Sequence, residues 1–160
     1  KKYVSELKEG KVTNSRWQGD DFFGTTGFGW VDYFTKQIKA FFLEKGIYSK
    51  NIVKLHSYNE LISDKFLVGI LNSKFISYYV KNFITSTHTL QINDGRLIPI
   101  FVPNKVFAKD FENIIDKILT KKHQDPAADT SNLEAEIDRM VYDLYGLTKK
   151  EREIVDEELK

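Results

Sequence analysis

The sequence contains no cysteine among its 160 residues. A disulfide-stapled scaffold and a cysteine-ligated zinc site are therefore excluded, and a reducing compartment is favoured. No uncharged stretch is long enough to cross a membrane, and the N-terminal residues lack the apolar run of a signal peptide. We therefore expect a cytoplasmic protein without a membrane partner. Because the sequence opens on Lys1 rather than on methionine, we interpret it as a piece of a longer protein.

Sequence patterns that would indicate catalysis are also missing. His56, His88 and His123 are scattered without ligand spacing, so we expect no metal site. The glycines of residues 24–29 are not followed by Gly-Lys-Ser/Thr, which argues against a P-loop and favours turn glycines. The sequence has neither a Gly-x-Ser-x-Gly motif nor an Asn-Pro-Pro-Tyr-type methyltransferase motif. We therefore expect no catalytic residue here and predict that this chain by itself is not an enzyme.

What the sequence does have is an uneven distribution of charge. The formal net charge is only +1, but residues 1–109 carry 16 Lys and Arg against 9 Asp and Glu, whereas residues 110–160 carry 8 against 14. A basic body with an acidic tail is expected when only the body meets the phosphates of a nucleic acid, although ordinary variation in composition gives the same imbalance. In the tail, Glu134 and Asp138 would share a helix face. We interpret them as a solvated surface or as ion-pair partners of the basic body, not as an acid–base pair.

Apolar residues make up 41% of the sequence and aromatic residues 14%, which suits a buried core that contains a sheet. Two runs, residues 37–43 and 51–56, have the composition of β-strands. The apolar spacing then changes to a helical period over residues 66–80. A tight break is predicted inside this stretch at Asn72 and Ser73, because Asn can end one helix and Ser can cap the next.

The middle of the sequence predicts extended structure. Residues 85–92 are polar and β-branched, which indicates a strand or an extended loop that ends in a turn at Asn93-Asp94-Gly95. Residues 97–102 have the composition of a buried strand, which Pro99 would make an edge strand or an irregular one. Four aromatic residues could stack on a base, although we expect them to pack in the core: Trp17, Phe23, Phe28 and Trp30.

The last third of the sequence predicts helices. Apolar stripes at helical spacing cover residues 107–119 and 133–144. Ser131 and Thr148 each precede a glutamate by three residues, which is the pattern of a capping box, and Gly146 is placed as a C-terminal cap. We expect an α+β fold: a small twisted mixed sheet with short helices, followed by a C-terminal helical hairpin. The expected division is an N-terminally truncated body over residues 1–103 and a helical tail or spacer over residues 104–160.

Several segments, taken in order, resemble the TaqI-like C-terminal specificity domain of type IIG restriction–modification enzymes. They are Phe66-Leu67-Val68-Gly69-Ile70-Leu71-Asn72-Ser73-Lys74, Leu97-Ile98-Pro99-Ile100, Leu133-Glu134-Ala135-Glu136-Ile137-Asp138 and Val141-Tyr142-Asp143-Leu144-Tyr145-Gly146-Leu147-Thr148. The chain is also similar to the target-recognition domains of type I specificity subunits. The resemblance covers roughly residues 64–156. It implies a parent enzyme that methylates adenine N6 and often cleaves DNA, while this domain selects the DNA sequence.

The same resemblance implies the partners and cofactors. The partners would be double-stranded DNA and the methyltransferase and nuclease domains of the parent chain. The parent would use S-adenosylmethionine, and Mg²⁺ if it cleaves, with no cofactor bound by these residues. An alternative interpretation is a protein–protein assembly or spacer module, whose amphipathic helical tail docks onto the methyltransferase domain.

Candidate DNA contacts follow from the resemblance and from side-chain chemistry. The segment before the Leu-Ile-Pro-Ile element helps to recognise bases in such enzymes, and hydroxyl, imidazole, amide and guanidinium groups suit base edges. The candidate base contacts are Thr85, Ser86, Thr87, His88, Thr89, Gln91 and Arg96. The candidate phosphate contacts are Lys36, Lys39, Lys54, Lys74 and Lys81. The alternatives are a solvated loop for the first set and ordinary surface charges for the second.

Overall fold

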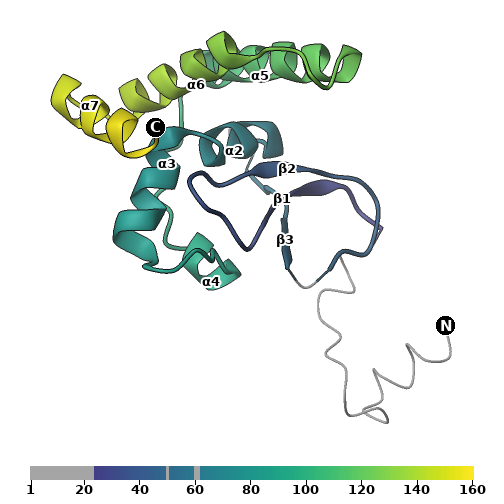
Figure 1. Ribbon diagram of the computed structural model, residues 1–160. Helices are drawn as coiled ribbons and strands as arrows, with labels where there is room; N and C mark the ends of the chain where they lie inside the picture. The colour runs from purple at the N-terminus through teal and green to yellow at the C-terminus, as the bar shows by residue number, and fades with distance from the viewer. Residues whose placement is uncertain (1–23, 50, 60–61) are drawn as a thin grey trace, which may run out of the picture.

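The computed structural model describes residues 24–49, 51–59 and 62–160. Within these residues the chain forms a small three-stranded sheet together with short and long helices (Figure 1). This confirms the expected α+β class with helices at the C-terminal end. The strands are β1 (Gly27–Val31), β2 (Ala40–Leu43) and β3 (Ile52–Leu55), in the order β2-β1-β3.

The described strands pair only in antiparallel fashion, so they do not form the mixed sheet that we expected. The link between β1 and β2 is too short for the crossover that a parallel pair requires. Strand β1 is central, and its Trp30 lies opposite Ala40 on one side and Val53 on the other. Glycine is required at position 29, because a Cβ atom there would overlap the carbonyl oxygen of Val53.

The predicted helical stretch is broken where we expected it. Helix α2 (Asp64–Leu71) ends at Asn72, and Ser73 caps the next helix, α3 (Lys74–Tyr79), by accepting a hydrogen bond from the backbone N–H of Ile76 at 3.3 Å. Helix α3 continues into a π-helical turn, η2 (Val80–Ile84). The break turns α3 away from α2, so that α2 covers the sheet while α3 reaches the C-terminal helices (Figure 1).

The side chain of Asn72 also closes the outer edge of the sheet. Its amide nitrogen donates to the carbonyl oxygen of Ala40 at 2.9 Å and to that of Val68 at 2.8 Å, and its amide oxygen accepts the N–H of Ala40 at 3.1 Å. The carboxamide therefore stands where the peptide group of a further strand would lie. Blocking an edge strand in this way protects it from pairing with another chain.

We predict that Asn72→Ala lowers the free energy of unfolding by about 1–2 kcal/mol, because three hydrogen bonds are exchanged for bonds to water at a solvent-accessible edge. Asn72→Asp is the matched variant, since it keeps the acceptor for Ala40 but loses both donors. Urea denaturation followed by circular dichroism measures both. An unchanged midpoint for both variants would show that this clamp contributes nothing to stability.

The prediction of a turn at Asn93-Asp94-Gly95 is wrong. These residues belong to the short helix α4 (Ile92–Gly95), whose N-cap is Gln91. The carboxylate of Asp94 accepts the N–H of Gln91 at 2.9 Å, as in a capping box. Of the strand or extended loop predicted for residues 85–92, the structure has a loop that bends at residues 86–88 and forms one isolated bridge at Thr89.

Residues 97–102 are irregular and join no described strand. Pro99 removes a backbone donor, and its carbonyl oxygen accepts a hydrogen bond from the hydroxyl of Tyr145 at 2.6 Å instead of from a neighbouring strand. Of the two possibilities that the proline left open, the structure therefore has the irregular one.

The C-terminal part forms three helices: α5 (Lys105–Gln124), α6 (Ser131–Leu144) and α7 (Lys149–Glu158). Helices α5 and α6 lie side by side at one end of the molecule, which is the predicted hairpin (Figure 1). Thr148 and Glu151 form the expected capping box, and Gly146 has the positive φ of 68° that a C-terminal cap requires. At the start of α6 the capping residue is Thr130 rather than the predicted Ser131.

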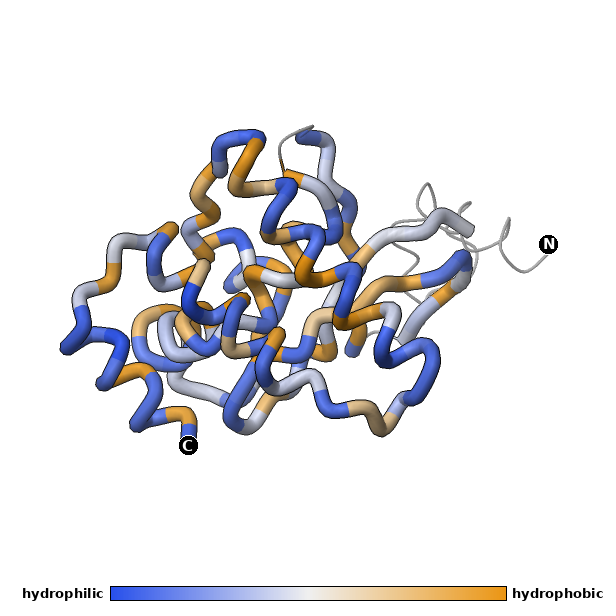
Figure 2. The backbone as a smooth tube through the Cα atoms, turned by 90° about the horizontal axis from the view of Figure 1, so that it is seen from above, coloured by the Kyte–Doolittle hydropathy of each residue, from blue (hydrophilic) through white to orange (hydrophobic). Residues whose placement is uncertain are grey.

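One hydrophobic core joins the body and the tail. Phe66 of α2 is 0% exposed and lies against Phe111 of α5, with 5.1 Å between ring centroids. Phe28 and Trp30 are each 2% exposed, so they pack in the core as we expected, whereas Trp17 and Phe23 lie outside the described residues. Helix α7 is mainly hydrophilic, with isolated apolar residues (Figure 2). The expected division at residues 103 and 104 stays a prediction.

Candidate nucleic-acid interface

The candidate base-contacting residues are attached to the sheet through a short antiparallel ribbon. We call residues 85–96 the recognition segment, and residues 32–34 with 88–90 the ribbon. The N–H of Leu90 donates to the carbonyl oxygen of Asp32 at 2.6 Å, and the N–H of Phe34 donates to that of His88 at 2.9 Å. The sequence did not show that residues 32–34, which directly follow β1, would pair with this segment.

The recognition segment packs on the buried Trp30 of strand β1. Leu90 is 0% exposed, and its carbonyl oxygen accepts a hydrogen bond from Nε1 of Trp30 at 2.8 Å. Gly95 packs directly on the same indole ring, because a Cβ atom there would lie 2.8 Å from Cη2 of Trp30. The segment is therefore fixed to the central strand by both apolar contact and a buried hydrogen bond.

The polar side chains of the recognition segment lie at the surface. Ser86, Thr87, His88, Gln91 and Arg96 are exposed, while the other two candidates, at positions 85 and 89, are half-buried. A segment whose backbone is anchored and whose donors and acceptors face solvent can contact base edges without first rearranging.

Three threonine hydroxyls form a line along this segment. Oγ1 of Thr87 lies 2.9 Å from Oγ1 of Thr85 and 2.8 Å from Oγ1 of Thr89. At the other end, Nη1 of Arg96 donates to the side-chain oxygen of Asn93 at 3.2 Å. These local bonds orient the side chains while leaving further donors and acceptors for a ligand.

Tyr33 is a surface residue of the ribbon that sequence reasoning missed. Its side chain is 58% exposed, and its ring centroid lies 6.2 Å from that of His88. The pairing of Tyr33 with Thr89 places it beside the recognition segment. Nothing in the local sequence indicates this neighbourhood, because it depends on pairing between distant parts of the chain.

Two of the predicted phosphate-contacting lysines are paired with helix α7. Nζ of Lys74 lies 3.0 Å from Oδ1 of Asp156, and Nζ of Lys81 lies 2.9 Å from Oε1 of Glu158. The hydrogen bond from Lys81 holds the pKa of Glu158 below its ordinary value. Each of these lysines already shares its charge with a carboxylate, which weakens its attraction for a phosphate.

The other three lysines are spread over different elements. Lys36 donates to the backbone carbonyl oxygen of Lys160 at 2.7 Å, and Lys54 donates to that of Thr25 at 2.6 Å. Lys39 is exposed and forms no ion pair within the described residues. Lys36, Lys74 and Lys81 thus all contact residues 156–160. The contact of the five lysines with phosphate stays a prediction.

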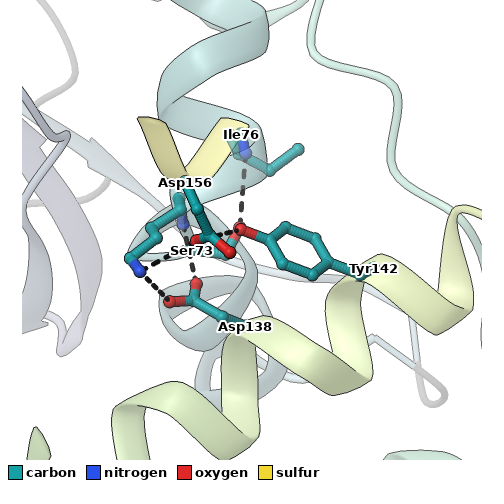
Figure 3. A network of polar contacts seen from close by, with 6 residues as sticks. Ser73, Ile76, Asp138, Tyr142 and Asp156 are labelled. Carbon is teal, nitrogen blue, oxygen red and sulfur yellow. Dashed lines mark hydrogen bonds and ion pairs between the residues drawn. The ribbon is translucent and has the colours of Figure 1, made fainter. Parts of the chain in front are cut away.

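A polar network connects the break between α2 and α3 with helices α6 and α7 (Figure 3). The backbone N–H of Lys74 donates to Oδ1 of Asp138 at 2.8 Å, and the hydroxyl of Tyr142 donates to Oδ1 of Asp156 at 3.0 Å. Burial raises the pKa of Asp138, whose side chain is 13% exposed, although Lys74 opposes this shift. Burial and the hydrogen bond to Asp156 also raise the pKa of Tyr142.

This network ties helices α6 and α7 to the break between α2 and α3. A hollow of about 860 Å³ lies beside it between β2 and the α5–α6 hairpin, with Lys74 and Asp138 in its wall. Both carboxylates of the network already accept hydrogen bonds from neighbouring groups. Nζ of Lys74 also lies 3.9 Å from Oδ2 of Asp138, which confirms for Asp138 the predicted ion pairing between the acidic tail and the basic body.

Across the described ranges, no helix has the length and apolar character needed to span a membrane. Those same ranges contain no group of three or more side chains suited to a metal ion. Comparison of the chain with family models, curated proteins and solved structures finds no match.

Proposed function

We propose that this chain is a sequence-specific recognition module for double-stranded DNA within a restriction–modification enzyme. Other domains would methylate adenine N6, and cleave where the parent is also a nuclease, using S-adenosylmethionine and Mg²⁺. The observation that carries the proposal is the recognition segment, whose polar side chains face solvent while its backbone is fixed to β1. The resemblance of the sequence to specificity domains supplies the class of ligand.

The chemistry of the segment fits the major groove. That groove admits a two-stranded ribbon, and each base pair presents a distinct pattern of donors and acceptors there. Gln91 suits the N6 and N7 atoms of adenine, and Arg96 suits the O6 and N7 atoms of guanine. His88 and the neighbouring hydroxyls can donate or accept. Phosphate contacts would add affinity that falls steeply with salt, because bound cations are released from DNA.

The test is a selection from random-sequence duplexes with the intact protein. We expect the wild-type protein to enrich one defined sequence. A variant with His88→Ala, Gln91→Ala and Arg96→Ala should lose that sequence, with each lost base contact costing about 1–3 kcal/mol of discrimination. Its thermal unfolding should change little, because the three side chains are exposed.

The matched control is Lys150→Ala, which removes one positive charge from an exposed site on α7. It should enrich the same sequence as the wild type. Enrichment of the wild-type sequence by the triple variant would contradict the proposal, as would a wild-type protein that enriches nothing.

A second candidate function, docking onto the methyltransferase domain, is favoured by one observation. The stripes that we expected to offer the docking face are used internally, since Ile115 and Val141 are 5% and 0% exposed. Apolar side chains are exposed instead between α4 and the first turn of α5. They are Leu97 at 63%, Phe101 at 53%, Val102 at 56% and Val106 at 72%. Exposed apolar patches of this kind mark protein contacts. Replacing Leu97 and Val106 with serine should then prevent assembly of the intact enzyme while the selected sequence stays the same, and this result would support the second function.

A further inference from the structure

The ribbon has two strands, and all the proposed base contacts lie on one of them, the recognition segment. The recognition segment supplies His88 and Thr89, while residues 32–34 supply the opposite strand. On that strand Phe34 is 5% exposed and points into the core, whereas Tyr33 is 58% exposed. The alternation expected for an extended strand thus turns Tyr33 outward.

We propose that Tyr33 is a further specificity-determining residue, which recognises a thymine in the major groove together with its neighbour His88. This inference rests on the proposed function. Among the described residues, the one ring that lies near Tyr33 is that of His88, with 6.2 Å between centroids and an angle of 58° between planes. The phenol ring is therefore open to a ligand on most of its surface.

The chemistry of tyrosine matches what thymine presents. In the major groove a thymine offers an acceptor, O4, next to the apolar C5-methyl group. Tyrosine has an apolar ring with a hydroxyl donor at its tip. The ring would contact the methyl group while the hydroxyl donates to O4, and His88 would contact the adjacent base pair. The pairing of Tyr33 with Thr89 holds both side chains on one short stretch of ribbon.

The lack of charge on Tyr33 also distinguishes this role from phosphate binding. A tyrosine carries no positive charge at neutral pH, so its contact should not alter the dependence of binding on salt. Its contribution should depend on the base that it meets. This is a readout that a merely structural residue would not change.

The experiment replaces thymidine by deoxyuridine, one position at a time, in the duplex that the wild-type protein enriches. Deoxyuridine lacks only the C5-methyl group. At the position that Tyr33 contacts, we expect this replacement to weaken wild-type binding about fourfold, the cost of withholding one methyl group from apolar contact. Tyr33→Ala should bind the two duplexes equally, whereas Tyr33→Phe should still distinguish them.

The matched control is Tyr58→Ala, which removes a tyrosine that is 87% exposed. Tyr58 follows β3 at the end where Leu55 pairs with Phe28, whereas Tyr33 follows β1 at the other end of the sheet. This control should respond to deoxyuridine as the wild type does. If the wild type enriches a sequence but Tyr33→Ala keeps the full methyl effect at every thymine, the role of Tyr33 is overturned while the proposed function stands. If the wild type enriches no sequence, both are overturned.

Discussion

Replacing Phe111 with alanine should lower the free energy of unfolding by about 3–5 kcal/mol, the range for removing a fully buried phenylalanine. Phe111 is 0% exposed on α5 and lies between Phe66 of α2 and Phe107 of its own helix, with ring centroids 5.1 and 5.9 Å away. It also packs on Gly69, where a Cβ atom would come within 2.5 Å of its ring. Residues of both the body and the tail pack against this side chain. Few neighbouring side chains can therefore shift to fill the cavity that Phe111→Ala leaves.

Urea denaturation of the wild type and the variant measures this loss. Leu119→Ala is the matched control on the same helix, because Leu119 is 40% exposed and its truncation should cost less than about 1 kcal/mol. Since Phe111 joins the two parts of the chain, we expect one cooperative transition in each protein. A loss below about 1 kcal/mol for Phe111→Ala, or two separate transitions, would show that the body and the tail do not share a core.

The features that the sequence predicted well are those decided by neighbouring residues. The break between α2 and α3 follows from the capping chemistry of Ser73, and the start of α7 follows from the Thr148–Glu151 pair. Both depend on hydrogen bonds that span three residues. The helical hairpin follows from apolar periodicity, which is also a local pattern.

The features that the sequence could not predict depend on distant partners. Residues 97–102 have the composition of a strand, but a strand exists only where another strand pairs with it, and none of the described strands does. The ribbon shows the opposite case, since Tyr33 acquires its place beside His88 through pairing across the chain. The candidate base contacts could be named from one local segment, whereas Tyr33 could not.

The uneven charge of the sequence is partly balanced within the folded protein. The acidic helix α7 does not stay apart from the basic body, because Asp156 and Glu158 pair with Lys74 and Lys81. Part of the basic excess is thus neutralised within the molecule. The proposed DNA contact therefore depends more on the uncharged donors and acceptors of the recognition segment than on a general positive field.

Removing the carboxylate of Asp138 should be the second most costly change. Asp138→Ala leaves the backbone N–H of Lys74 without its acceptor and removes one carboxylate from the junction shown in Figure 3. We expect the free energy of unfolding to fall by about 1–3 kcal/mol at neutral pH, the cost of leaving a buried donor unsatisfied, because Lys74 is still paired with Asp156. Asp138→Asn should lose much less, because its amide oxygen can still accept the N–H of Lys74.

The pH dependence of these variants separates the two roles of the carboxylate. In the unfolded chain Asp138 ionises near its ordinary pKa of about 4. In the folded protein burial raises this pKa, so the carboxyl group ionises only at higher pH. Between those two values the unfolded state loses its proton first, and the stability that the protonated group contributes is lost as pH rises.

Asparagine cannot ionise, so the stability of Asp138→Asn relative to the wild type should rise from pH 4 toward neutrality. Asp138→Ala should follow the same trend from a lower starting value, because it lacks the acceptor at every pH. Urea denaturation at a series of pH values measures these differences. A wild type that instead gains stability over Asp138→Asn as pH rises would mean that the attraction of Lys74 for the carboxylate outweighs the cost of burying it.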